Sequence, residues 1–380
     1  MNLLTCQKNL FDLDDEVTYL NLAYMSPLLK SVARAGVNAV NQKLKPWQVY
    51  PVDFFSQVDK AKHLFSRLIN SHESQRVAII PSISYGITNA ARNIQFNKGD
   101  QIILLDKQFP SNVFPWQDLA KEKDLKIDMI PVPESTTRGA DWNAEILNTI
   151  QSNTKVVSIE HVHWTDGTKF DLEAISKKAK SVGALLIIDA TQSIGNLRLD
   201  QSKIQADVIV ATGYKSLLGP YAIGFAYYNS YFDNGMPIEN NWINKSNSEN
   251  FEGLLNYEQE YKPQANRYSM GEQSQFIHMP MQVQALEQIL EWGVENIQAY
   301  SKSILDPILP LLHQKKIWIE NEMHRSNHLF GLKPSKKIDQ TLKQRIRDEN
   351  IFVSYRDSSI RVSTHLYNDR ADLEKLIDIL

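Results

Sequence analysis

The chain contains 380 residues, of which 42% are hydrophobic and 22% are charged, and its formal net charge is -3. A single hydrophobic core rarely extends beyond roughly 250 to 300 residues, so this length predicts two domains. The small net charge argues against nucleic acid and against a charged membrane surface as partners.

The N-terminal residues contain no basic segment followed by an apolar one, so they do not resemble a secretory signal peptide. No apolar stretch approaches the roughly 20 residues that span a bilayer. Cys6 is the only cysteine, so no disulfide can form within the chain. We therefore expect a soluble protein of the reducing cytoplasm.

From about residue 76 onward, short β-branched runs alternate with longer helical patterns. One helical pattern spans residues 171–181, where Leu172, Ile175 and Ala179 recur at helical spacing. Such alternation predicts an α/β fold with a mostly parallel sheet that helices cover on both faces. The seven predicted strands are residues 76–80, 101–105, 126–131, 156–161, 184–188, 208–211 and 224–228.

The residues after 230 follow different patterns. Residues 231–270 are polar and rich in Asn, Glu and aromatic side chains, which favours a surface excursion or a subunit contact over a flexible linker. A helical pattern from about 280 to 300 predicts one long helix. The remainder is typical of a smaller α+β domain that ends with an amphipathic helix at 369–380.

Residues 80–91 pass from a predicted strand through Ser82 and Ser84 into a helix. Free backbone N–H groups at a helix N-terminus, beside two hydroxyls, suit a phosphate group. In such sheets, ligands bind beyond the carboxyl ends of the strands. Pro81, Asp189 and Thr212 all follow predicted strands at that edge. The alternative for this segment is a serine N-cap with no ligand.

Lys215 lies between two apolar runs, and Asp189 ends an earlier apolar run, Leu-Leu-Ile-Ile-Asp. Pyridoxal 5′-phosphate (PLP) chemistry needs an amine that forms a Schiff base and a carboxylate that keeps the pyridine nitrogen protonated. Thr212 and Tyr214 add hydroxyls for a phosphate. Taken singly, Lys215 also fits a surface loop lysine, and Asp189 fits a cap of the following turn.

These residues resemble the class V aminotransferase family of fold-type I PLP enzymes, and the resemblance covers nearly the whole chain. Its strongest motif is the pair Asp189-Ala-Thr-Gln192 and Thr212-Gly-Tyr-Lys215. The resemblance implies that Lys215 is the Schiff-base lysine, Asp189 the pyridinium partner and Gln192 the ring-hydroxyl contact. Residues implied to hold the phosphate are Ile83 through its backbone, Ser84, Thr212 and Tyr214.

The same resemblance implies further contacts. Phe109 falls where the family stacks a ring on the cofactor, and Arg361 where an arginine grips the substrate carboxylate. Without the family, Phe109 fits a core residue and Arg361 an exposed strand arginine. Asn21 and Ala23 match the N-terminal segment that passes over the substrate. The implied division is an N-terminal arm at 1–25, a large PLP-binding domain at 26–275, and a linking helix with a small domain at 276–380.

The chain departs from its relatives at several positions. Desulfurases need a thiolate on a small-domain loop, whereas the only cysteine here is Cys6, so we do not expect desulfurase activity. Trp164 replaces an Asn near the ring hydroxyl and reshapes the substrate pocket. A homodimer remains the expectation, with Gln273 or Ser274 as the candidate contact to the partner's phosphate.

Two histidines raise the question of a metal. His161 and His163 lie two apart on a predicted strand and so face the same way. No third ligand is obvious near them, whereas zinc sites usually need three or four protein ligands. We therefore predict no metal site.

The leading hypothesis is a PLP enzyme that acts at the α-carbon of an amino acid by transamination, with a keto acid as the second substrate. The alternatives are a lyase or epimerase on the same fold and a non-catalytic PLP-fold protein. Gly213-Tyr-Lys-Ser lacks the upstream glycine of a P-loop, which argues against a nucleotide site.

Overall fold

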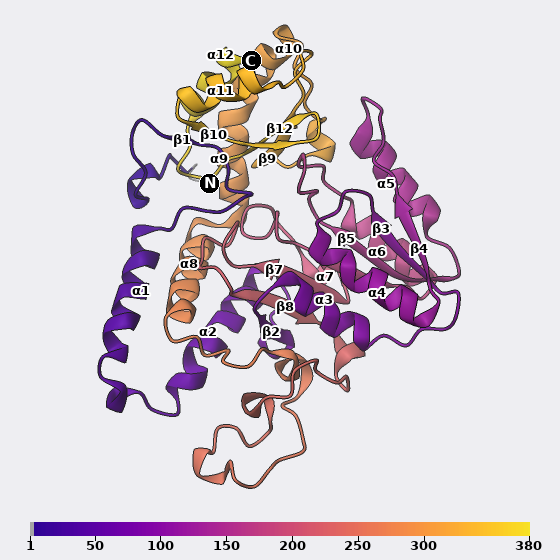
Figure 1. The fold of residues 1–380 in the computed structure, drawn as a ribbon, viewed down its shortest axis with the longest axis vertical. Coiled ribbons are helices and arrows are strands. Elements are labelled where there is room, and N and C mark those ends of the chain that lie inside the picture. Colours follow the sequence, from indigo (N-terminus) through magenta and orange to yellow (C-terminus); the bar gives the residue numbers. More distant parts are fainter. Residues whose placement is uncertain (1–3) are drawn as a thin grey trace.

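A computed structural model describes residues 4–380, and within them a seven-stranded sheet forms the centre of the large domain (Figure 1). The strand order is β2-β8-β7-β6-β5-β3-β4. The predicted sheet is therefore confirmed, with each strand within two residues of its expected bounds. The strands are β2 (Val77–Ile80), β3 (Gln101–Leu105), β4 (Lys126–Ile130), β5 (Thr154–Glu160), β6 (Leu185–Asp189), β7 (Val208–Thr212) and β8 (Gly224–Tyr228).

The sheet is mostly parallel, and β8 is the strand that runs in the opposite direction, between β2 and β7. Residues of β2, β3, β6, β7 and β8 are all buried, as expected for strands covered on both faces. Alternate residues of β2 enter two different cores: Val77 and Ile79 pack in one, Ala78 and Ile80 in the other. Because β5, β6 and β7 are parallel neighbours, their carboxyl ends lie at the same edge of the sheet.

Helices cover both faces of this sheet (Figure 1). Helix α3 begins directly after β2, where the Ser82 side chain accepts a hydrogen bond from the Tyr85 N–H and so caps it. The helices of the large domain are α1 (Lys30–Lys43), α2 (Asp53–Leu68), α3 (Ile83–Arg92), α4 (Phe114–Lys123), α5 (Arg138–Thr149), α6 (Leu172–Ser181) and α7 (Gln201–Ile204). Within residues 4–380, no helix is long and apolar enough to cross a membrane.

The prediction of one long helix at 280–300 is wrong, because the segment forms two helices. Helix α8 (His278–Trp292) ends at Gly293, and α9 (Val294–Leu305) begins beyond it. Gly293 has a φ of 77°, which side chains with a Cβ rarely adopt. The apolar pattern continues through the break, so periodicity alone could not reveal it. Together the two helices lead from the large domain to the small one (Figure 1).

The C-terminal part is a smaller α+β unit, as predicted. Its antiparallel sheet has the order β11-β12-β9 within the described residues, and helices pack beside it. The elements are α10 (Leu309–Gln314), β9 (Leu329–Leu332), α11 (Gln340–Asp348), β10 (Ile351–Phe352), β11 (Ser354–Arg356), β12 (Ser359–Ser363) and α12 (Arg370–Ile379).

The N-terminal segment lies against this small unit. Strand β1 (Thr18–Tyr19) pairs in parallel with β10. Asn21 forms a bridge with Ser363, and its Oδ1 accepts a hydrogen bond from Ser354 Oγ at 2.8 Å. The arm then passes from the small unit to the edge of the large sheet. The proposed boundaries at residues 25 and 275 remain a prediction.

Residues 231–270 form a long excursion below the sheet in the view of Figure 1. It holds only short 3-10 turns among its described residues, which agrees with the expected surface excursion. It is anchored by an aromatic cluster in which Phe54 packs edge-on against Trp242, Phe251 and Phe276.

Candidate active site

A pocket opens at the carboxyl edge of the sheet, where β5, β6 and β7 end. It brings together seven of the eight residues predicted to bind the cofactor, and Ser84 is the one that does not line it. The lining residues are Ile83, Phe109, Glu160, Val162, Trp164, Asp189, Thr191, Gln192, Thr212, Tyr214 and Lys215. Residues from five separate parts of the chain thus share one hollow.

Lys215 is buried, with 6% of its surface exposed, so the alternative of a surface loop lysine is wrong. Its Nζ lies 5.1 Å from the ring centre of Phe109 and 5.5 Å from that of Tyr214. Burial lowers the pKa of the amine to about 8, while the charge of Asp189 acts in the opposite direction. A lysine held in this way is more readily a neutral nucleophile than a free lysine is.

Asp189 ends β6 and is buried in the same pocket. Burial raises the pKa of its carboxyl group, and hydrogen bonds from Thr191 and the charge of Lys215 partly offset this. Oδ1 accepts the Thr191 N–H at 2.9 Å. Asp189 therefore both caps the following turn and lines the pocket.

Glu160 is a pocket residue that the sequence reasoning missed. It ends β5, is 2% exposed, and accepts one backbone N–H on each oxygen. Oε1 accepts from Phe109 at 2.8 Å and Oε2 from Trp164 at 3.0 Å. Burial and the nearby Asp189 raise the pKa of its carboxyl group to about 8. An acid at the end of a buried strand was the signal used for Asp189, and it applies equally to Glu160.

A second hollow of about 170 Å³ continues from the pocket to the start of α3. Ile83, Thr212 and Tyr214 line both spaces. Thr212 Oγ1 is buried and has no hydrogen-bond partner among residues 4–380, so it is available to a ligand oxygen. Ser84 Oγ lies 3.1 Å from Ser82 Oγ, and its predicted role toward the phosphate remains a prediction.

Arg361 reaches the opening of the site from β12. It is 1% exposed, so the alternative of an exposed strand arginine is wrong. Nη1 donates to the Trp164 carbonyl at 2.9 Å and Nη2 to Ser354 Oγ at 3.2 Å. Its Nε has no partner within the described chain. Arg361 shares a pocket of about 450 Å³ with Lys215, Ala23 and Trp164.

Phe109 and Trp164 form an aromatic wall between these groups. Their rings meet edge to face at 5.4 Å, and Trp164 Nε1 donates to the Lys107 carbonyl at 2.7 Å. The hydroxyl of the neighbouring Thr165 lies 2.7 Å from His163 Nδ1. Trp164 therefore lines the pocket, and its contact with the substrate remains a prediction.

The N-terminal arm reaches the site at Ala23, whose carbonyl accepts from Gln192 Nε2 at 3.2 Å. The Gln192 carbonyl in turn lies 2.7 Å from His328 Nε2. Asn21 is buried against Ser354 and does not line the pocket, so its contact with the substrate remains untested. Through this hydrogen bond Asn21 contacts β11, the strand that ends at Arg356.

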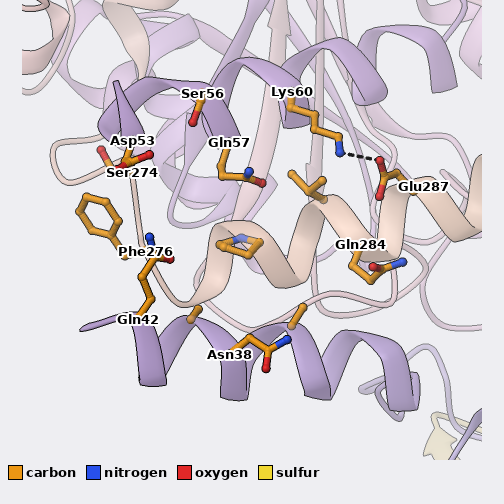
Figure 2. Close-up of a pocket in the computed structure, with 14 residues that line it drawn as sticks. Asn38, Gln42, Asp53, Ser56, Gln57, Lys60, Ser274, Phe276, Gln284 and Glu287 are labelled. Carbon is orange, nitrogen blue, oxygen red and sulfur yellow. Dashed lines mark ion pairs between the residues drawn. The ribbon is translucent and has the colours of Figure 1, made fainter. Parts of the chain in front are cut away.

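Another large hollow lies between α1, α2 and α8 (Figure 2). Its wall includes an ion pair between Lys60 and Glu287 at 2.7 Å and the amide side chains of Asn38, Gln42, Gln57 and Gln284. Ser274 lines it and donates to the Phe54 carbonyl at 2.7 Å, while Gln273 donates to Asn244 at 3.4 Å. Both candidates for the contact with the partner's phosphate thus have partners within their own chain, and that contact remains a prediction.

A metal site gains no support from the geometry. Across residues 4–380, no three His, Cys, Asp or Glu side chains gather as metal ligands. His161 and His163 are both buried, and burial lowers the pKa of their rings to about 3 and about 4.

Comparison with known proteins shows to which family the chain belongs. A sequence profile described as "Aminotransferase class-V" matches residues 48–376. The chain belongs to the class V aminotransferase family. Class V members use PLP, so this protein is a PLP-dependent enzyme that acts on amino acids. The buried lysine, the buried Asp189 and the unpartnered Thr212 hydroxyl fit that cofactor.

The curated relatives of this class V protein are distant. A probable cysteine desulfurase of Pyrococcus abyssi is 31% identical over 177 residues, which is 46% of this chain and 43% of that protein. This match therefore spans less than half the length of that relative. An uncharacterised aminotransferase of Schizosaccharomyces pombe is 23% identical and covers 98% of this chain and 93% of its own length.

Among solved structures, a C-DES variant with glycine covalently linked to its PLP cofactor superposes on this class V protein with a TM-score of 0.87. The match covers 98% of each chain at 17% identity. At that identity the likeness confirms the fold and leaves the reaction open.

Proposed function

We propose that this enzyme transfers the amino group of an amino acid to a keto acid. The observation that carries the proposal is the pocket in which Lys215, Asp189 and Arg361 converge. Cys6, the only cysteine, lies in the N-terminal segment outside this pocket, so no thiol is placed to accept sulfur. The relative from Schizosaccharomyces pombe, which matches over nearly the whole chain, also bears the name aminotransferase.

Each residue has a definable task. PLP, when bound, supplies an electron sink for charge that develops at the α-carbon of the substrate. Lys215 would attach the cofactor through its amine and later carry the proton at the α-carbon, for which a pKa of about 8 is suitable. Asp189 would hold the proton on the pyridine nitrogen.

The remaining residues bind and orient. Ile83 N–H, Thr212, Tyr214 and Ser84 would hold the phosphate at the start of α3. Phe109 would cover one face of the cofactor ring, and Gln192 would contact the ring hydroxyl. Arg361 would grip the α-carboxylate of the substrate, since a guanidinium matches a carboxylate in two hydrogen bonds.

The test has two parts. Protein purified with PLP should show a visible absorption band that borohydride removes and that Lys215→Ala lacks. It should then form keto acid from an amino acid only when a keto acid acceptor is added. Protein that stays colourless with PLP would contradict the cofactor assignment of Lys215.

A lyase or epimerase is the second candidate, because the matched C-DES structure is also described as a cystine C-S lyase and shares this fold. Such an enzyme would use the same Lys215 and Arg361. Ammonia release without an acceptor would favour the lyase, and racemisation without keto acid would favour the epimerase.

We also propose a homodimer located in the cytoplasm. Helix α1 and the loop after it expose a row of large apolar side chains that a second subunit would cover. These residues are Val37, Val40, Leu44, Trp47, Tyr50 and Val52. Sedimentation equilibrium should give twice the mass of the chain, and Leu44→Glu with Trp47→Glu should shift it toward the monomer. A wild-type protein of monomer mass would contradict the dimer.

A further inference from the structure

Two arginines of one hairpin face the same pocket. Arg356 ends β11 and Arg361 lies on β12, and the two strands pair in antiparallel register. Both line the 450 Å³ pocket that also holds Lys215. The Arg356 Cζ lies 4.9 Å from the ring centre of Trp164, and the Arg361 Cζ lies 5.8 Å from it. One indole therefore lies within reach of both guanidinium groups.

Among the described residues, no carboxylate neutralises either arginine. Across residues 4–380, no carboxylate forms an ion pair with Arg356 or Arg361. Arg356 donates from Nη1 to the adjacent Tyr355 carbonyl at 2.7 Å, and its Nε is buried without a partner in the described chain. The nearest acid in sequence, Asp357, pairs instead with Lys107.

The charge balance of the pocket points to an anionic ligand. Burial lowers the pKa of both arginines, and Arg356 further lowers the pKa of Arg361, because two like charges lie near each other. Partly buried, unpaired cations are costly to keep. A substrate with a single carboxylate would satisfy only one of the two.

We propose that Arg356 binds a second carboxylate, so that the substrate is an acidic amino acid and its keto acid counterpart. Arg361 takes the α-carboxylate, Arg356 takes the distal one, and the Trp164 ring packs against the carbons between them. This inference rests on the proposed function of the pocket. It adds a substrate class that the family resemblance does not supply.

Binding of non-reactive carboxylates to the PLP-loaded enzyme tests the assignment. Succinate and butyrate have the same carbon number and differ in one carboxylate, and both can be followed by titration calorimetry. We expect succinate to bind at least about tenfold more tightly than butyrate, the scale of one charge-assisted hydrogen-bonded pair.

The variants separate the two arginines. Arg356→Gln should weaken succinate by about tenfold and leave butyrate within about twofold, whereas Arg361→Gln should weaken both. Arg345→Gln, at an exposed position on α11, is the matched control and should change neither. Arg356→Lys keeps the charge without the planar fork and should fall between wild type and Arg356→Gln.

The outcomes are distinct. Equal binding of succinate and butyrate by a wild-type enzyme with its normal visible absorption would overturn the acidic-substrate proposal alone. An Arg356→Gln enzyme with normal absorption that loses both ligands equally would assign Arg356 to packing on Trp164 and also overturn it. Wild-type protein that cannot acquire the visible band would instead overturn the proposed function.

Discussion

Glu160 and Asp189 are register partners at the carboxyl ends of the parallel strands β5 and β6. Partners in register on neighbouring parallel strands point their side chains to the same side of the sheet. The two acids therefore enter the same pocket, but they have different partners. Asp189 accepts from Thr191, while Glu160 ties down the backbone of Phe109 and Trp164.

Glu160→Ala should leave both of those N–H groups without an acceptor. Leaving one buried N–H without an acceptor costs about 1–3 kcal/mol, so with two such groups the free energy of unfolding should fall by about 2–6 kcal/mol. Cofactor affinity should fall as well, because the loop that carries Phe109 loses its anchor. Chemical denaturation and PLP titration measure the two effects. Glu145→Ala, exposed on α5, is the control, and an unchanged Glu160→Ala protein would contradict the anchoring role.

The buried Lys215 amine should lower the free energy of unfolding of the cofactor-free protein. Its pKa falls from 10.5 unfolded to about 8 folded, so below pH 8 folding must bury a charged amine. Between these pKa values the unfolded state binds more protons than the folded one, and stability rises with pH. Lys215→Met should therefore stabilise the apoprotein at pH 7 by up to about 3 kcal/mol, at 1.36 kcal/mol per pKa unit.

That gain should shrink as the pH rises from 8 toward 10.5, because the amine is then neutral in the folded state and progressively loses its proton in the unfolded state. Denaturant titrations of both proteins at pH 7 and pH 10 provide the comparison. Lys177→Met, at an exposed position on α6, corrects for the general effect of removing a positive charge. A Lys215→Met protein that is less stable than wild type at pH 7 would show that the amine is satisfied in the apoprotein.

Arg361→Lys should reduce kcat/KM for the amino acid by about 10- to 1,000-fold, mainly through a higher KM. Lysine keeps the charge but cannot hold the Trp164 carbonyl, Ser354 and a carboxylate together. The visible absorption of bound PLP should be unchanged, since Arg361 lies on the substrate side. Steady-state kinetics with a spectrum of each enzyme would distinguish this from a loss of cofactor.

Gly293→Ala should lower the free energy of unfolding by about 1–2 kcal/mol, because an alanine is strained at a φ of 77°. The junction between α8 and α9 would be forced away from its native angle. Gly183 has a similar φ of 78° with nothing within 4 Å of an added Cβ, so Gly183→Ala measures the backbone strain alone. A larger loss at Gly293 than at Gly183 would identify the effect of the helix junction.

The seven strands, the small C-terminal unit and the edge where Asp189 and Lys215 meet were predictable from the sequence. Buried strands of a parallel sheet are short apolar runs, and their chain order constrains the topology. The helix break at Gly293 was not predictable, because the apolar period continues across it while the backbone changes direction.

Tertiary structure alone decided which distant residues complete the pocket. Ala23 reaches Gln192, and Arg361 reaches the Trp164 carbonyl, across separations of 169 and 197 positions. The spacing of apolar residues indicates whether a segment is a strand or a helix, but it does not indicate which elements contact each other. For the same reason Arg356 could not be predicted: it is one charged residue on a strand until the fold places it beside Arg361 in one pocket. Glu160 differs, because it ends a buried strand as Asp189 does, and the fold adds only that the two are register partners.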